Sequence, residues 1–110
     1  MKDALDGMVH STIEGLESIH DYVQLLMDRC ILSIYTPATY RSVLGEGGRL
    51  DANWSMARGH AIAAVSYCEG AYVELCLDDG AAIRISLCEN DYSGPEALSL
   101  HFGDGSIVVV

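Results

Sequence analysis

One short pattern occurs twice in this 110-residue chain, and the duplication constrains the fold more than any single residue does. YVQLLMDR at residues 22–29 recurs fifty residues later as YVELCLDD at residues 72–79. The first run is followed by ILSI and the second by AIRIS. We therefore predict one domain, residues 1–110, that contains two equivalent units at residues 9–42 and 59–94.

The second copy has the alternation of a β-hairpin with one apolar and one polar face. A DDG turn ending at Gly80 fits a three-residue loop, because glycine adopts the left-handed conformation that this loop requires. That loop length sets Leu75 opposite Ile83 on the apolar face. It sets Glu74 opposite Arg84 on the other face, so a single register explains both faces.

The first copy has a shorter turn, and both of its faces are apolar. A two-residue loop at Asp28 and Arg29 sets Leu25 opposite Leu32 on one face. On the opposite face the cross-strand pairs are Leu26 with Ile31 and Tyr22 with Tyr35. We therefore expect this hairpin to be buried on both sides or to lie at an interface.

A helix competes with strands over the N-terminal third, because the apolar residues there keep a three-four spacing. They are Leu5, Val9, Thr12, Leu16, Ile19, Val23 and Leu26. Gly7 and Gly15 interrupt this stripe, and the strand assignment of the second copy carries over to the first. We expect at most a short helix, before about Met8.

Each unit also begins with an extended segment, and the chain closes with a third hairpin at residues 97–110. Two three-stranded units and this hairpin predict an all-β fold of about eight antiparallel strands, arranged as a sandwich or a partly open barrel. The terminal run IVVV would be an aggregation hazard at an exposed edge. We expect it to form a central strand or to pair with its mate in a dimer.

The charge balance restricts the partners. Six Lys and Arg against sixteen Asp and Glu give a net charge of −10, which argues against nucleic-acid binding. The charge either keeps an apolar-rich domain soluble or complements a basic protein. No apolar run is long enough to span a bilayer, and the acidic N-terminus does not resemble a signal peptide, so we expect a cytoplasmic protein.

No motif in the sequence indicates catalysis or a cofactor. The four cysteines form no CxxC pair and have no His at ligand spacing, so we expect reduced and mostly buried thiols. There is no phosphate loop and no GxSxG motif. His10 and His60 lie fifty residues apart; they either meet across a pseudo-twofold axis, to bind a metal or titrate together, or hydrogen-bond locally. We favour local hydrogen bonds, because neither has a second ligand at suitable spacing.

Aromatic residues mark the loops. Two loops follow Tyr40 and Tyr92 at equivalent places in the copies, and loops on a rigid scaffold often carry binding residues. Trp54, with Arg58 close to it in sequence, either plugs the end of the core or anchors a partner.

Parts of both hairpins resemble small bacterial β-rich proteins, some of which are candidate immunity proteins of toxin systems. The matching pieces are DYVQL with LSIY in the first copy, and VELCLDDG with GPEA in the second. The shared motifs are turns and strand faces, and the resemblance implies no functional residue.

The leading hypothesis is a non-enzymatic acidic binding protein, of the immunity type, that sequesters a basic protein partner. The alternatives are a homo-oligomeric scaffold, for which a homodimer is the expected form, and a small-ligand-binding β-barrel. The residues predicted to contact a partner are Tyr40, Trp54, Arg58, Tyr92, Tyr22, Tyr35, Leu26 and Ile31. We predict no catalytic, cofactor-binding or metal-binding residue.

Overall fold

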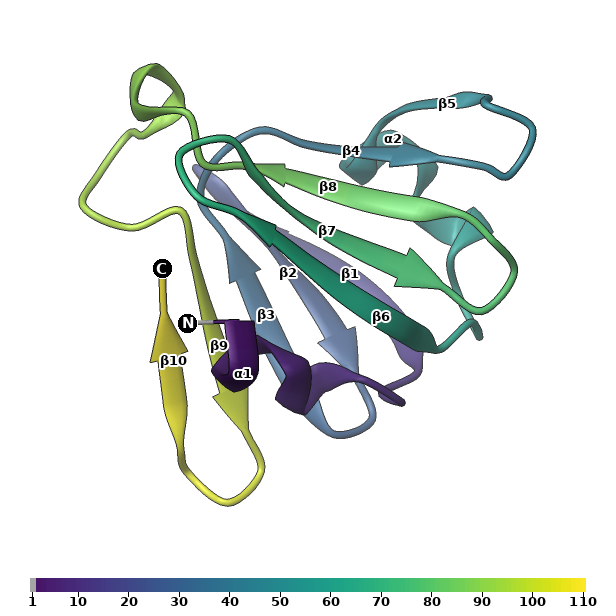
Figure 1. The fold of residues 1–110 in the computed structure, drawn as a ribbon, viewed down its shortest axis with the longest axis horizontal. Helices are drawn as coiled ribbons and strands as arrows, with labels where there is room; N and C mark the ends of the chain where they lie inside the picture. Colours follow the sequence, from purple (N-terminus) through teal and green to yellow (C-terminus); the bar gives the residue numbers. More distant parts are fainter. Residues whose placement is uncertain (1) are drawn as a thin grey trace.

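The structure is a computed structural model that describes residues 2–110, and these residues form a sandwich of two five-stranded antiparallel sheets (Figure 1). Sheet 1 contains, in spatial order, β1 (Ile13–Ile19), β2 (Tyr22–Met27), β3 (Cys30–Ile34), β9 (Leu98–Phe102) and β10 (Ile107–Val109). Sheet 2 contains β5 (Gly47–Arg49), β4 (Ala38–Arg41), β8 (Ala82–Ser86), β7 (Tyr72–Leu77) and β6 (Ile62–Cys68). The predicted all-β class is confirmed: the strands of the described residues form two separate antiparallel sheets and no closed barrel.

Short helical turns precede each copy. The chain begins with α1 (Lys2–Leu5) and the 3-10 turn η1 (Asp6–Met8), which agrees with the short helix predicted before Met8. Between the copies lie α2 (Leu50–Asn53) and η2 (Trp54–Met56), and a third 3-10 turn, η3 (Glu89–Asp91), follows β8. From Leu16 onward, the stripe of the competing helical interpretation lies in β1 and β2 instead.

Both predicted hairpin registers are confirmed. In the second copy Leu75 pairs with Ile83 and Glu74 with Arg84, and Gly80 closes the turn with a φ of 88°. In the first copy Leu25 pairs with Leu32, as the alternation of side chains requires. The inner residues of these hairpins are buried apart from the half-buried Val23, so burial of one face determines the register in each copy.

The duplication extends further than the sequence predicts. If the strands of the two copies exchange places, so that β1 becomes β6, β9 becomes β4 and so on, the strand order of sheet 1 becomes the strand order of sheet 2. Each copy therefore has five strands, not three, and it gives its fourth and fifth strands to the sheet of the other copy. The prediction of eight strands missed β4 and β5, because β5 is a three-residue strand containing two glycines and has no side-chain alternation.

The first strands of the two copies meet across the local two-fold axis. The amide of His10 donates to the carbonyl of Ile62 at 2.8 Å, and the amide of Gly59 donates to the carbonyl of Ile13 at 2.8 Å. His10 and Gly59 also share a positive φ, of 76° and 86°. His10 is thus equivalent to Gly59, and His60 is equivalent to Ser11. The predicted correspondence of the two histidines was one residue out of step.

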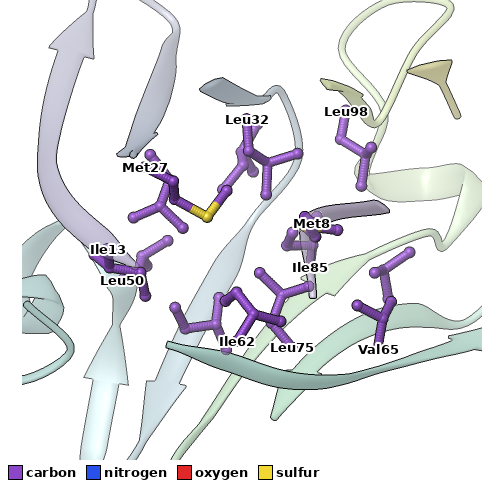
Figure 2. Packing of buried hydrophobic residues seen from close by; sticks show 14 of the residues in the cluster. Met8, Ile13, Met27, Leu32, Leu50, Ile62, Val65, Leu75, Ile85 and Leu98 are labelled. Carbon is purple, nitrogen blue, oxygen red and sulfur yellow. The ribbon is translucent and has the colours of Figure 1, made fainter. Parts of the chain in front are cut away.

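The core fills the space between the sheets with side chains from both copies (Figure 2). Figure 2 shows Ile13, Met27, Leu32 and Leu98 from sheet 1 facing Ile62, Val65, Leu75 and Ile85 from sheet 2. Met8 and Leu50 come from the helical turns and are also fully buried. The core between the sheets is therefore built from apolar side chains of both copies.

Candidate protein-binding surfaces

The predicted partner-binding residues do not form one surface. Tyr40 is 3% exposed and lies in the core, because it points inward from β4 between the outward-facing Thr39 and Arg41. It is therefore not available for direct contact with a partner, which corrects that prediction. Trp54 and Tyr92 are half-buried and pack against the core.

The four residues predicted for the first hairpin do share the outer face of sheet 1. Tyr22 and Tyr35 lie side by side with ring centroids 5.0 Å apart and an interplanar angle of 50°. Leu26 pairs with Ile31 on the same face, and Ile31 is 40% exposed. These four side chains form apolar ends of the face, as the sequence predicts for the first copy, on either side of the row Gln24, Ser33 and Ser99.

A polar row crosses this face toward β9. The Tyr35 hydroxyl lies 3.1 Å from Ser99 Oγ, and Ser99 Oγ lies 3.3 Å from His101 Nε2. On the neighbouring strands Gln24 Nε2 donates to Ser33 Oγ at 3.3 Å. The polar groups of the face thus bond to one another and leave no uncompensated charge at its centre.

A hollow of about 640 Å³ opens beside the tyrosine pair, where the chain leaves β3 for β4 in the other sheet. Tyr22, Tyr35 and Pro37 line it on one side, and Arg49 and Asp51 line it on the other. A smaller hollow of about 210 Å³ adjoins Tyr35. We call these two depressions together the tyrosine hollow.

Carboxylates surround the tyrosine hollow. Asp21 and Asp51 line its larger part, and Glu96 lines the smaller part. Arg49 Nη2 pairs with Asp51 Oδ2 at 2.7 Å, but the Arg49 side chain is 81% exposed, so solvent weakens this pair. The arrangement offers aromatic faces beside negative charge, which is a combination that binds cationic side chains.

The outer face of sheet 2 differs, because it carries the arginines Arg41 and Arg84, and Arg84 is already paired with an acid. Arg84 Nη2 lies 3.4 Å from Glu74 Oε1, and the Arg84 guanidinium carbon lies 3.9 Å from the centre of the Tyr72 ring. A pocket of about 220 Å³ lies beneath the turn between β4 and β5, next to this pair. Arg84 is paired here and Arg41 is exposed on the same face, so this is the less suitable surface for a basic partner.

One polar cluster was missed by sequence reasoning, which assigned Asp78 and Asp79 only to a turn. His60 Nδ1 lies 2.7 Å from Asp78 Oδ1, and His60 Nε2 lies 3.6 Å from Asp79 Oδ2. The three potential ligand atoms lie within 4.8 Å of one another, so the cluster resembles a weak metal site. Both nitrogens of the imidazole face a carboxylate, which is a local arrangement of the kind predicted for His60.

The Asp78 carboxylate has a structural role that explains its position. Its Oδ2 accepts a hydrogen bond from the amide of Ala61 at 3.2 Å, and the equivalent Asp28 Oδ1 accepts one from the amide of Thr12 at 2.8 Å. The Ala61 amide, followed by the contact with His60, lowers the pKa of Asp78 below its usual value. Because both copies use this aspartate to anchor the start of a strand, we assign the cluster to folding.

All four cysteines are free thiols, but they are less buried than predicted. Cys30 is buried, and burial raises the pKa of its thiol. Cys76 is half-buried, whereas Cys68 and Cys88 are exposed. The prediction of mostly buried thiols was therefore wrong for Cys68 and Cys88, which lie at the end of β6 and just after β8.

No protein-family model matches this chain, and comparisons with curated proteins and with solved structures likewise gave no match. Within residues 2–110, no helix has the length and apolar character needed to cross a membrane.

Proposed function

We propose that this protein is a non-enzymatic binding protein of the immunity type, which acts in the cytoplasm and sequesters a basic protein partner. The observation that carries the proposal is the tyrosine hollow, where the paired rings of Tyr22 and Tyr35 stand beside Asp21, Asp51 and Glu96. A Lys or Arg side chain of the partner would enter the hollow, lie against a ring and face the carboxylates.

The physical terms favour this mode of binding. A cation over an aromatic ring contributes about 0.5 to 2 kcal/mol, depending on how far it is desolvated. Tyrosines in a concave, partly dry site are frequent centres of binding energy. The net charge of −10 adds long-range attraction, which raises the association rate with a cationic protein and is screened by salt.

The binding of a deca-arginine peptide, measured by titration calorimetry, tests the site directly. The double variant Asp21→Asn/Asp51→Asn removes two charges from the hollow, and Tyr22→Leu removes one of its rings. We expect each to weaken binding by roughly five-fold or more. The control Glu14→Gln/Glu46→Gln removes the same charge from exposed positions outside the hollow and should weaken binding much less.

The natural partner is sought by capture from the host lysate with the unmodified protein and with the same variants. A basic protein that is captured by the control, lost with the hollow variants and released by salt supports the proposal. Recovery of only acidic or uncharged partners, or a capture that ignores the hollow variants, contradicts it.

A further inference from the structure

The edge strand β10 exposes both its side chains and its backbone. Ile107 is 57% exposed and Val109 is 44% exposed, and Figure 1 shows β10 at the border of the molecule with β9 beside it. The backbone amide of Val110 donates to the carbonyl of Leu98 at 3.0 Å, and the amide of Phe102 donates to the carbonyl of Ser106 at 3.0 Å. Bonded and non-bonded pairs alternate along an antiparallel ladder, so the N–H and C=O groups of Ile107 and Val109 point away from β9.

Each of the other three sheet edges of the described chain packs against a helical turn along part of its length. The 3-10 turn η2 packs against β1, and α1 and η1 pack against β6. At β5, the outward-facing carbonyl of Arg49 accepts a hydrogen bond from Asn53 Nδ2 at 2.8 Å, and α2 turns back over that strand. Among residues 2–110, no hydrogen-bond partner covers the outward groups of Ile107 and Val109.

We propose that β10 pairs edge to edge with β10 of a second copy of this chain. In the antiparallel register centred on Val108, Ile107 lies opposite Val109 of the second copy, and the reverse pair lies across the axis. Each of these two pairs exchanges two backbone hydrogen bonds, so four bonds form and the two copies of sheet 1 become one ten-stranded sheet. The strand is self-complementary in this register, which is the requirement of a two-fold interface.

Side chains and charge favour a second copy as the occupant. Ile107 and Val109 project from the same face as Ile31 and Leu26, because Ile107 pairs with His101 and His101 pairs with Ile31. The join therefore extends the apolar end of the outer face of sheet 1 across the two-fold axis. The run of β10 carries no charged side chain, so two molecules of net charge −10 would pair through uncharged side chains.

This dimer and the proposed basic partner differ in their response to salt. Salt screens the repulsion between two acidic copies and should strengthen self-association, whereas it screens attraction to a basic partner and should weaken that complex. The two proposals use separate surfaces. If the dimer does not form, binding of a basic partner can still be measured, and the reverse also holds.

Sedimentation equilibrium over about 10 to 300 µM, the range in which small interfaces dissociate, is the first test. We expect the unmodified protein to form dimers, and Ile107→Lys/Val109→Lys to be monomeric, since lysine on an edge strand blocks pairing. The control Val43→Lys/Leu44→Lys places the same charges at apolar positions that are 69% and 84% exposed, and it should still dimerise. Circular dichroism verifies folding, and Ile107→Thr/Val109→Thr retains the β-branched shape if the lysine variant unfolds.

Disulfide trapping tests the register, in a chain with Cys68→Ser and Cys88→Ser. In the proposed dimer Val108→Cys lies opposite its own mate in a non-hydrogen-bonded pair, where the spacing suits a disulfide, while Ile107→Cys faces Val109 instead. We expect oxidation to cross-link the first variant at least ten-fold faster than the second. A monomer at all concentrations, including one whose β10 binds a strand of another protein, overturns the proposal. Dimerisation that survives both the lysine and threonine changes, or equal cross-linking of the two cysteine variants, also overturns it.

Discussion

The β4–β5 and β9–β10 hairpins occupy equivalent places in the two sheets, yet their edges are opposites. The first ends in Gly-Gly-Arg, and the Arg49 carbonyl is capped by Asn53 as α2 turns over the strand. The second ends in Ile-Val-Val, with its outward backbone groups and side chains exposed. The duplication thus determines where the strands lie, and divergence between the copies determines which edge stays open.

The central hairpins show the same division. Gln24 and Ser33 form a neutral cross-strand pair in the first copy, where Glu74 and Arg84 form a charged one in the second. The central hairpin of the first copy therefore presents an uncharged outer face with the tyrosine hollow at its side. The second presents a face whose charges are already paired.

The largest effect should come from the core, where the copies are alike. Leu25 and Leu75 occupy equivalent strands and are both fully buried. We expect Leu25→Ala and Leu75→Ala each to lower the free energy of unfolding by about 2 to 5 kcal/mol, through lost apolar burial and a cavity. Urea unfolding measures both. A loss confined to one copy would show that the two halves do not share one cooperative core.

A smaller effect is expected from opening the protected edge. Asn53→Ala removes the hydrogen bond to the Arg49 carbonyl and should cost about 1 kcal/mol or less. It should also increase self-association through β5, because the Arg49 carbonyl would then be open like the outward backbone groups of Ile107 and Val109. Asn53→Asp retains an oxygen but not the amide donor and serves as the matched variant. Unchanged sedimentation of Asn53→Ala would mean that α2, rather than the amide, protects this edge.

The pH dependence of stability tests the strand anchor Asp78. Because the folded-state pKa of Asp78 is lowered, the unfolded chain binds its proton first, so the contribution of Asp78 is present above about pH 4 and is lost as pH falls through the folded value. Asp78→Asn should flatten the acid side of the stability curve below about pH 4. Thermal melts across this range, with Glu46→Asn as an exposed control, measure the change. An unaltered curve for Asp78→Asn would show that the Asp78 carboxylate does not stabilise the folded state.

The smallest effect is expected at the surface ion pair of the second copy. Arg84 is 46% exposed, so its pair with Glu74 should contribute about 0.5 kcal/mol or less. Glu74→Gln gives the second copy the residue that the first has at this position and should change the midpoint of urea unfolding only slightly. A loss well above 1 kcal/mol would show that the two outer faces differ in stability as well as in charge.

The sequence predicted the features that depend on local alternation. The pairing of Leu25 with Leu32 and of Glu74 with Arg84 follows from which faces are apolar and from loop length, and both pairs are present. The terminal run IVVV was correctly predicted as a strand, but it lies at an edge within the chain rather than at the centre of a sheet. Its place in the sheet depends on each copy giving its last two strands to the sheet of the other copy. No local sequence pattern records that exchange.

The candidate site was less predictable, because it depends on segments that meet only after folding. Tyr40 was predicted to lie at a loop, but it belongs to a four-residue strand and its side chain points into the core. A strand this short shows no clear alternation in the sequence. The tyrosine pair was predicted from the register, whereas the approach of Asp51 from α2 was not. One signal in the sequence could have indicated a structural role for Asp78: Asp28 and Asp78 follow equivalent strands in the two copies.

The central claim is that divergence between two copies of one fold leaves an open edge for self-pairing and an acidic hollow for a basic partner. Sedimentation velocity from about 50 to 500 mM NaCl, with and without deca-arginine peptide, tests both parts in one series. The account predicts that the dimer fraction rises with salt while bound peptide falls. Dimerisation and peptide binding that weaken together with salt, or that both ignore it, would contradict the account.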